Sequence, residues 1–463
     1  MGLKLREYQQ SSIDEIRRRF LQGKQAVLLV LPTGSGKTVV FCKMAQAAIE
    51  KQKRILIIVH RIELLNQASE KLISLGVDHG KISPHFMPEY EKHIQVASID
   101  SIIKRLDKIS MPDLIIFDEC HHVVKGNKFG RLVEKFSNIR ILGVTATPIR
   151  YGGDGLGVNA KGFFDDLVVG STVEELTKLK YLVPAKYFAP KSHIEFKKLR
   201  IIHGDYDAKE LAAKINIPDV TGDAIKHYKK LSDGLLAIVF CVDIQHAMDV
   251  AKSFNEAGIS SNSIDSSQSY PERTKILESF SKGNIKVICS VNIISEGTDL
   301  PNACAAIILR KTMSLSLHLQ MIGRVLRPAP NKTHAIIIDH VGNLTEHGFA
   351  TSEYKWSLDS KPKSDFQGSF LTQCQSCYSV FDFRKHKICP ECFEKVPIEH
   401  HEKQYLEENL VEVRPEELSP KIKMIRGAKT IDDLKRIAKE NNYKPGWVHL
   451  MKKFLPQHRA FNI

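Results

Sequence analysis

The segment at residues 31–38 (LPTGSGKT) lies between an apolar run, residues 26–30 (AVLLV), and the apolar residues 39–41 (VVF). A glycine-rich loop between a buried strand and a helix lets consecutive backbone N–H groups converge on phosphate oxygens, because no Cβ blocks their approach. The helix that begins near Lys37 adds the positive end of its dipole. Lys37 can reach the terminal phosphates of a nucleotide, and the Thr38 hydroxyl can bind Mg²⁺. The segment therefore predicts an α/β fold that binds a nucleotide at its first strand.

A carboxylate for the same metal follows a second apolar run, residues 114–117 (LIIF). Asp118 comes directly after this predicted strand, and open parallel sheets bind ligands at the carboxyl edge. We expect Asp118 to hold the hydration shell of Mg²⁺ and Glu119 to orient or deprotonate the attacking water.

Short apolar runs alternate with helical patterns twice along the chain. The runs are 26–31, 55–59, 114–117 and 140–144 in the first series, and 235–240, 286–289, 305–309 and 335–338 in the second. Runs without polar alternation suit parallel strands that are buried on both faces. Helical patterns such as residues 63–75 and 270–281 supply the crossovers. We expect two α/β domains in tandem, at residues 1–190 and 191–345.

The bulk composition is that of a globular protein, with 463 residues, 43% of them hydrophobic and 26% charged. No apolar run approaches the roughly 18 residues that cross a bilayer, and the charged N-terminal segment lacks the apolar core of a signal peptide. We expect a cytoplasmic protein with no membrane partner. The net charge of +14 predicts a polyanionic partner, or else reflects a basic surface without one.

Further motifs resemble those of superfamily 2 helicases, in the order that this superfamily has them. They are residues 3–9 (LKLREYQ), 31–38 (LPTGSGKT), 59–67 (VHRIELLNQ), 118–121 (DECH), 145–148 (TATP), 238–247 (IVFCVDIQHA), 295–301 (SEGTDLP) and 320–328 (QMIGRVLRP). The general phosphate-loop pattern begins with Gly where this chain has Leu31, a position at which the superfamily does not require Gly. The motif sequences most resemble those of RadD-like and phage-type DNA helicases. The resemblance implies two RecA-like P-loop domains with ATP bound between them.

The same resemblance implies roles for individual residues. ATP would contact Arg6, Gln9, Thr33, Gly34, Ser35, Gly36, Lys37, Thr38, Asp118, Gly297 and Asp299. The catalytic residues would be Glu119 from the first domain and Gln320, Arg324 and Arg327 from the second. Only a closed cleft would bring these guanidinium groups to the γ-phosphate, where they stabilise charge in the transition state. Thr145 and Thr147 would couple the nucleotide site to the nucleic-acid site.

Contacts to the nucleic-acid backbone are implied for His60, Arg61, Ser98 and Ser290. Ordinary residues at strand ends and helix starts are an equally good interpretation of these four. A grip on backbone phosphates rather than base edges predicts little sequence preference and strong salt dependence.

A third region, residues 346–400, contains two C-x2-C pairs formed by Cys374, Cys377, Cys389 and Cys392. Two such pairs can complete a tetrahedral shell of four thiolates, which is typical of structural Zn²⁺. An iron–sulfur cluster is the alternative. Between the pairs lie aromatic and basic residues that could bind nucleic acid or could pack the small hairpin: Phe381, Phe383, Arg384, Lys385, His386 and Lys387. The other five cysteines are expected to be reduced core residues.

The last region, residues 401–463, is expected to be a small, helical and basic tail. Thr430 and Asp433 resemble a capping box in front of residues 431–440, where Ile431, Leu434, Ile437 and Ala438 share a helical face. The tail could guide DNA or dock a repair or replication protein. It could equally be a solvated helical pair whose aromatic residues pack internally.

The predicted function is a nucleic-acid-dependent ATPase that translocates on or remodels single-stranded, duplex or branched DNA, in repair, recombination or phage-type replication. One alternative is an RNA helicase. Another is an ATP-gated DNA clamp that recruits partners without separating strands.

Overall fold

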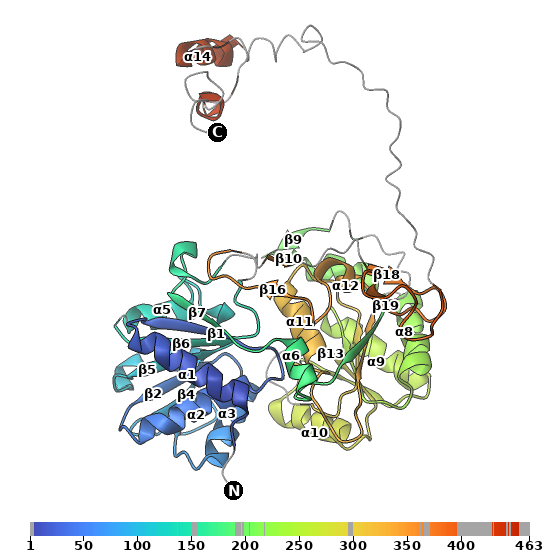
Figure 1. Cartoon of the computed structure of the whole chain (residues 1–463), viewed down its shortest axis with the longest axis horizontal. Coiled ribbons are helices and arrows are strands. Elements are labelled where there is room, and N and C mark those ends of the chain that lie inside the picture. The colour runs from blue at the N-terminus through green and yellow to red at the C-terminus, as the bar shows by residue number, and fades with distance from the viewer. Residues whose placement is uncertain are drawn as a thin grey trace. The chain divides into compact units, whose positions relative to one another are not determined.

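The computed structural model in Figure 1 describes most of the chain. The described residues are 4–136, 138–150, 155–189, 196, 199–202, 204–216, 218–294, 300–360, 363–364, 371–395, 428, 430–440, 443 and 446–452. The chain divides into two compact units, residues 1–396 and 397–463. Among the described residues, no helix combines the length and the apolar composition that crossing a membrane requires.

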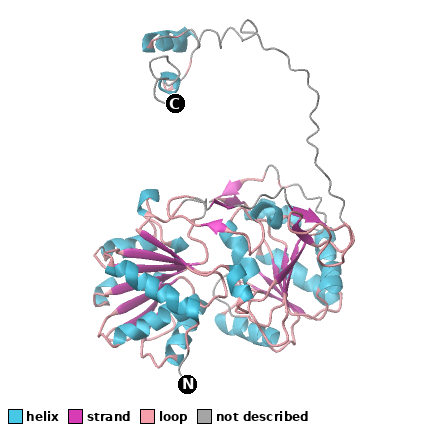
Figure 2. Ribbon diagram, viewed as in Figure 1, coloured by secondary structure: helices cyan, strands magenta, loops and turns pink. Residues whose placement is uncertain are grey.

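The first lobe of the larger unit is built on a parallel sheet of seven strands, in the order β3-β4-β2-β5-β6-β1-β7. The strands are β1 Ala26–Val30, β2 Ile55–Val59, β3 Gly80–Ile82, β4 Ile94–Ser98, β5 Leu114–Asp118, β6 Arg140–Thr145 and β7 Asp166–Val169. Its helices are α1 Glu7–Leu21, α2 Lys37–Ile49, α3 Ile62–Ser74, α4 Ile99–Ile102 and α5 Lys128–Lys135, and α6 Val173–Lys178 follows β7. Figure 2 shows helices on both faces of the strands.

The side chains of β1 show why this sheet needs cover on both sides. Successive residues of a strand point to opposite faces. Val27 and Leu29 belong to one buried cluster, whereas Leu28 and Val30 belong to another. The prediction of doubly buried parallel strands is therefore confirmed for the first lobe.

The second lobe has a parallel sheet of six strands, in the order β12-β13-β11-β14-β15-β8. Its strands are β8 Ala185–Phe188, β11 Ala237–Phe240, β12 Ser261–Ile264, β13 Val287–Ser290, β14 Ala305–Ile308 and β15 Ala335–Asp339. Its helices are α7 Ala208–Ile215, α8 Pro218–Leu231, α9 Ile244–Glu256, α10 Tyr270–Ser281, α11 Leu315–Gly323 and α12 Asn343–His347. A short hairpin, β9 Ile201–Ile202 and β10 Asp205–Tyr206, precedes α7.

One expected boundary differs from the structure. The first domain was expected to end at residue 190, but β8 lies in the second sheet, where it pairs in parallel with β15. The chain thus leaves the first sheet after β7 and enters the second sheet at Ala185. The local sequence does not reveal this, because the partner strand lies far along the chain.

The region after α12 packs on both lobes. Trp356 and Leu358 pack against a buried cluster of the first lobe, and the Leu358 carbonyl accepts a hydrogen bond from Gly157 N at 2.7 Å. A short ladder, β16 Tyr354–Lys355 with β17 Lys363–Ser364, precedes the cysteine hairpin of β18 Leu371–Gln373 and β19 Val380–Asp382. This hairpin docks on β8, because Ser379 forms an antiparallel bridge with Phe188.

The smaller unit contains two described helices, α14 Ile431–Glu440 and α15 Trp447–Met451. Asp433 N donates to Thr430 Oγ1 at 3.2 Å, and Thr430 N donates to Asp433 Oδ2 at 3.0 Å. The predicted capping box and the predicted buried face are confirmed: Leu434, Ile437 and Ala438 are buried. The rings of Tyr443 and Trp447 lie 4.4 Å apart within the same small core. These aromatic residues of the unit therefore pack internally.

Candidate functional site

The loop between β1 and α2 has a backbone conformation that depends on its two glycines. Gly34 and Gly36 have φ values of +84° and +86°, which residues with a side chain rarely adopt. Gly36 is also the N-cap of α2, so the N-terminus of this helix faces the loop. The Ser35 hydroxyl donates to the Pro32 carbonyl at 2.7 Å and fixes the turn. The loop thus presents donors and a helix N-terminus to one place.

This loop lines a cavity of about 430 Å³. The first lobe contributes Arg6, Thr33, Gly34, Gly36, Lys37, Thr38, Asp118 and Glu119, and the second lobe contributes Pro301, Arg324, Arg327 and Pro328. Burial lowers the pKa of the Lys37 ammonium below its ordinary value, while the carboxylates of Glu119 and Asp118 oppose this change. Positively charged side chains from both lobes therefore line the cavity, which suits a polyanionic ligand.

Two consecutive carboxylates lie at the end of β5, and both side chains are buried. Burial, and next the neighbouring Glu119 carboxylate, raise the pKa of Asp118 to about 6, although Lys37 lowers it. Glu119 has a φ of +49°, and its N–H donates to Asp118 Oδ1 at 3.0 Å. Two acidic groups in one buried pocket are the environment in which a divalent cation would relieve the repulsion. The residues present fit a bound Mg²⁺.

A chain of short contacts leads from Glu119 to the second lobe. Glu119 Oε2 lies 3.5 Å from Thr145 Oγ1 and 3.4 Å from His121 Nδ1. Thr145 Oγ1 in turn donates to the Thr147 carbonyl at 3.1 Å. Thr147 Oγ1 then donates to Ser316 Oγ on α11 at 2.5 Å.

Ser316 is a residue that sequence reasoning missed. It lies one helical turn before Gln320 on α11, so the helical period around Gln320 was the available signal. The same helix rests on the phosphate loop, because a Cβ on Gly323 would lie 2.5 Å from Thr33 Cβ.

Aromatic residues form a wall beside the loop. Tyr8 and Gln9 both donate to the Ser35 carbonyl, Gln9 from Nε2 at 3.2 Å. The Arg6 guanidinium lies 4.2 Å from the ring centroid of Tyr181, which also approaches Tyr8 at 5.5 Å. Gln9 is expected to contact the nucleotide. In this structure its side-chain amide donates a hydrogen bond to the backbone of the phosphate loop. Tyr181 was missed, and no local motif marks it.

The residues expected to contact nucleic acid separate into two groups. His60, Arg61 and Ser98 follow or end β2 and β4, at the same sheet edge as Asp118. Ser98 is the N-cap of α4 and donates to Ser101 Oγ at 2.9 Å. Ser290 is buried, and its hydroxyl accepts from Ile294 N at 3.2 Å. Ser290 therefore supports the local backbone in this structure. Gly297 and Asp299 lie outside the described residues.

The four cysteines of the hairpin converge. The sulfur atoms of Cys374, Cys377, Cys389 and Cys392 all lie within 4.8 Å of one another, and two pairs are separated by 3.5 Å. A tetrahedral shell with metal–sulfur bonds of about 2.3 Å requires sulfur atoms about 3.8 Å apart. The cluster could therefore hold a metal ion. Within the described ranges it is the one group of three or more His, Cys, Asp or Glu side chains placed to hold a metal ion.

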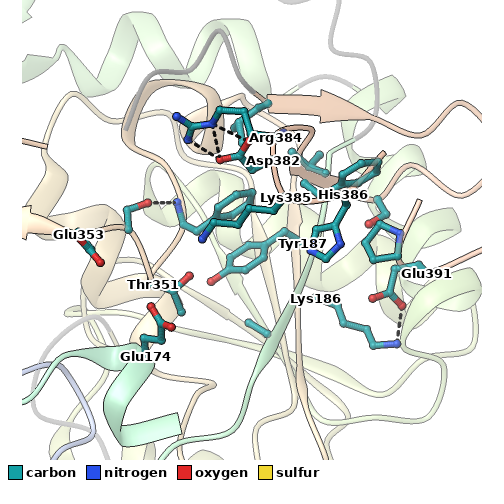
Figure 3. Close-up of a pocket in the computed structure, with 18 residues that line it drawn as sticks. Glu174, Lys186, Tyr187, Thr351, Glu353, Asp382, Arg384, Lys385, His386 and Glu391 are labelled. Carbon is teal, nitrogen blue, oxygen red and sulfur yellow. Dashed lines mark hydrogen bonds and ion pairs between the residues drawn. The ribbon is translucent and has the colours of Figure 1, made fainter. Parts of the chain in front are cut away.

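A second cavity, of about 340 Å³, lies where the cysteine hairpin meets the second lobe (Figure 3). Lys186 of β8 forms an ion pair with Glu391, and Arg384 is paired with Asp382 within the hairpin. Phe381 is buried in the hairpin core. The packing interpretation of the spacer is therefore confirmed for Phe381, and the charges around this cavity largely neutralise one another.

Two parallel-sheet lobes that share one phosphate-loop cavity define a P-loop protein with two RecA-like domains. Family models agree with this class: "Type III restriction enzyme, res subunit" matches residues 2–150, and "Helicase conserved C-terminal domain" matches residues 222–329. The chain belongs to the superfamily 2 helicases, as its motifs predicted.

Individual relatives support the same family. A "51.5 kDa protein" of a Lactococcus phage (isolate 7-9) is 33% identical over 416 residues, which cover 88% of this chain and 86% of the phage protein. A Saccharomyces cerevisiae protein with the name ATP-dependent helicase IRC3 is 30% identical over 73% of this chain. The match spans only 51% of the yeast protein. The "DNA 3'-5' translocase XPB2" of Sulfurisphaera tokodaii is 28% identical over 70% of this chain and 79% of its own length.

A solved structure has the same fold. A fragment described as an HsdR subunit of a type I restriction enzyme from Vibrio vulnificus YJ016 superposes with a TM-score of 0.59 at 22% identity. The superposition covers 74% of this chain and 67% of that one.

Proposed function

We propose that the chain is a DNA-dependent ATPase that translocates along DNA or remodels it. The observation that carries this proposal is the composite cavity, in which the phosphate loop and the carboxylates of one lobe face Arg324 and Arg327 of the other. When the parts of one site lie on two bodies, the rate of hydrolysis depends on how those bodies close. A DNA strand that is bound by both lobes would favour closure of the cleft. Each round of hydrolysis would then change how the two lobes bind that strand.

Within this proposal, each residue around the cavity has a distinct task. The backbone of the loop and Lys37 bind the phosphates, and Thr38 and Asp118 would hold Mg²⁺, which supplies positive charge to the phosphate oxygens. Glu119 orients the attacking water and accepts its proton. Arg324 and Arg327 stabilise the charge that develops on the transferred phosphoryl group, and Gln320 positions the reacting groups.

Two unpartnered atoms agree with a ligand in this place. Thr33 Oγ1 and Gln320 Nε2 are buried, and the described residues supply no hydrogen-bond partner for either. Buried polar groups are nearly always paired in complete sites. Thr33 lines the nucleotide cavity, and Gln320 lies on α11, whose Gly323 packs against Thr33.

DNA is the favoured polymer because the relative from Sulfurisphaera tokodaii is named a DNA translocase. The net charge of +14 suits the phosphate backbone of either polymer. RNA remains the alternative polymer, and a clamp that does not separate strands remains the alternative mechanism.

The proposal predicts that DNA accelerates steady-state ATP hydrolysis about tenfold or more, because DNA favours the closed cleft. The half-saturating DNA concentration should rise about tenfold or more between 50 and 200 mM salt, since contacts to phosphates release counterions. Single-stranded, duplex and branched DNA and RNA of matched length would be compared, with Lys37→Ala as the inactive control. The same rate of hydrolysis with and without nucleic acid would refute the proposal, and stronger stimulation by RNA would reassign the polymer.

A triplex-displacement assay distinguishes a motor from a clamp, because a clamp hydrolyses ATP without displacing the third strand.

We further propose that the four thiolates hold a structural Zn²⁺ rather than an iron–sulfur cluster. Purified protein should then contain one zinc per chain and show no visible absorption band. Cys377→Ser should lose the zinc and lower the melting temperature, because metal binding supplies much of the folding energy of so small an element. Cys304→Ser, a cysteine outside the cluster, should keep one zinc. Iron with absorption near 400 nm would contradict the assignment.

The remaining expectations concern location and partners. All nine cysteines are free of disulfides in the structure, which supports a reducing compartment such as the cytoplasm. We propose the unit at residues 397–463 as a site where repair or replication proteins or DNA bind, because α14 exposes Lys435 and Arg436, each in an ion pair with an aspartate of the same helix.

A further inference from the structure

Two side-chain contacts join α3 of the first lobe to α10 of the second. Arg273 Nη2 donates to Glu63 Oε1 at 2.6 Å, and Asn66 Nδ2 donates to the hydroxyl of Tyr270 at 2.9 Å. On each helix the two residues are three positions apart, so they share one helical face. None of the four lines the nucleotide cavity. We name this group, Glu63, Asn66, Tyr270 and Arg273, the α3–α10 latch.

The ion pair of the latch is shielded from water. The side chains of Arg273 and Glu63 are 13% and 14% exposed, so their attraction is weakly screened compared with that of a surface pair. Arg273 Nη1 also donates to the Gln268 carbonyl at 2.7 Å, which fixes the guanidinium before the lobes meet. Breaking one partner of such a pair leaves a charge buried without compensation. The contact therefore specifies one relative arrangement of the lobes.

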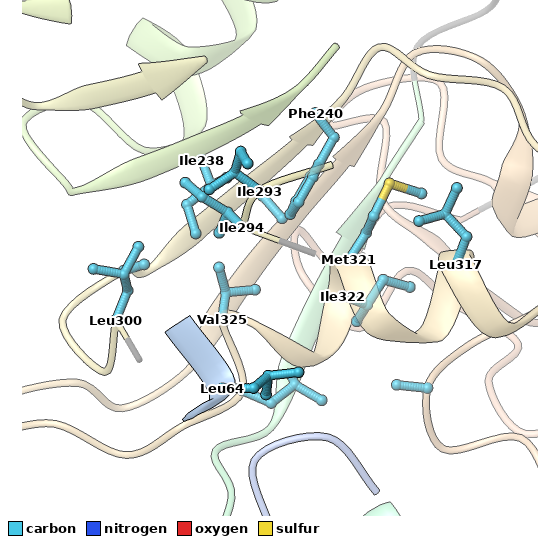
Figure 4. Packing of buried hydrophobic residues seen from close by; sticks show 14 of the residues in the cluster. Leu64, Ile238, Phe240, Ile293, Ile294, Leu300, Leu317, Met321, Ile322 and Val325 are labelled. Atoms are coloured by element: carbon cyan, nitrogen blue, oxygen red, sulfur yellow. The ribbon is translucent and has the colours of Figure 1, made fainter. Parts of the chain in front are cut away.

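Helix α3 connects this contact to the nucleotide cavity. Leu64 lies in the same buried cluster as Ile322 and Val325 of the second lobe, and Figure 4 shows these side chains together. Leu64, Gln67, Glu70 and Lys71 line the cavity itself. One face of α3 thus borders the nucleotide, while Glu63 and Asn66 bond the second lobe.

The same helix begins at the sheet edge where nucleic acid is expected. Arg61, the N-cap of α3, is two residues from Glu63. A strand bound at this edge would act on the first turn of α3, where the latch is anchored. Helix α3 thus borders the expected nucleic-acid edge, the nucleotide cavity and α10.

We propose that the α3–α10 latch positions the lobes for ATP hydrolysis. Its four residues lie outside the lining of the nucleotide cavity; they stabilise the arrangement in which Arg324 and Arg327 reach the phosphate loop. The proposal rests on the proposed function, in which hydrolysis requires closure. Loss of the latch should lower turnover and raise the nucleic-acid concentration needed for stimulation, while ATP binding to the first lobe changes little.

Charge reversal tests the latch directly. Glu63→Arg and Arg273→Glu should each lower DNA-stimulated kcat about tenfold or more, because like charges then face each other at the interface. The double variant E63R/R273E restores an ion pair of opposite polarity and should recover most of the lost turnover. A residue needed only for folding would not show this rescue. The matched control reverses Asp100 and Lys128, an exposed ion pair within the first lobe, which should leave turnover unchanged.

A milder variant keeps the test informative if a reversal impairs folding. Tyr270→Phe removes one hydroxyl from a partly exposed side chain. It should raise the half-stimulating DNA concentration about threefold, because the variant loses one hydrogen bond between the lobes. Melting temperatures are measured for every variant.

Three results would overturn the latch: wild-type turnover in both folded single reversals, a folded double variant no better than the worse single one, or an unchanged DNA requirement in Tyr270→Phe. If the wild-type protein itself ignores nucleic acid, the proposed function fails separately. The latch is then judged from basal kcat, which the single reversals should lower and the double variant restore.

Discussion

Glu119→Gln is expected to bind ATP with nearly wild-type affinity and to hydrolyse it about 10³-fold more slowly. The amide has almost the same size as the carboxylate, so the buried pocket beside Thr145 and His121 remains filled. What the substitution removes is the acceptor for the proton of the attacking water. Titration with a fluorescent ATP analogue and a phosphate-release assay measure the two quantities separately.

The control for this variant is Glu134→Gln, the same change at an exposed position of α5, which should behave as wild type. Full turnover by Glu119→Gln would exclude Glu119 as the base. A parallel loss of ATP affinity would instead mean that the carboxylate serves mainly to bind the metal nucleotide.

Arg327→Ala is expected to lower kcat about 10³-fold and to change ATP affinity no more than several-fold. The side chain crosses to the other lobe: a Cβ on Gly34 would lie 3.1 Å from Arg327 Cγ. A guanidinium in this position meets the phosphates only in the closed cleft, so its contribution belongs to the transition state rather than to the first binding step. Stopped-flow binding and single-turnover hydrolysis distinguish these steps.

Two further variants sharpen the second experiment. Arg327→Lys keeps the charge but loses the planar fork of donors, so it should recover little of the lost turnover. Arg131→Ala, on the exposed face of α5, should have no effect. An intact kcat in Arg327→Ala would remove this residue from the catalytic set.

Glu119 lies at one end of the contact chain that reaches Ser316 of the second lobe through Thr145 and Thr147. The base belongs to the first lobe and the last hydroxyl of the chain to the second. Any separation of the lobes would break the bond between Thr147 and Ser316. The position of the base and the closure of the cleft are therefore physically linked, which is the property that a motor driven by hydrolysis requires.

Several features of this protein were determined by the sequence alone, because each depends on neighbouring residues. The run at residues 26–30 has no polar alternation and forms a strand that is buried on both faces. The loop at 31–38 adopts its conformation through its own glycines. Thr430 caps α14 through a residue three positions away, and the two C-x2-C pairs converge because short spacings limit where thiols can lie.

Only the tertiary structure decided the pairings between distant segments. Strand β8 joined the second sheet through β15, and Trp356 and Leu358 packed on the first lobe. Contacts between the lobes, such as those of Ser316 and Tyr181 and the latch of α3 and α10, join segments separated by many residues. No local period or propensity encodes such contacts, since their geometry follows from how two complete cores pack against each other.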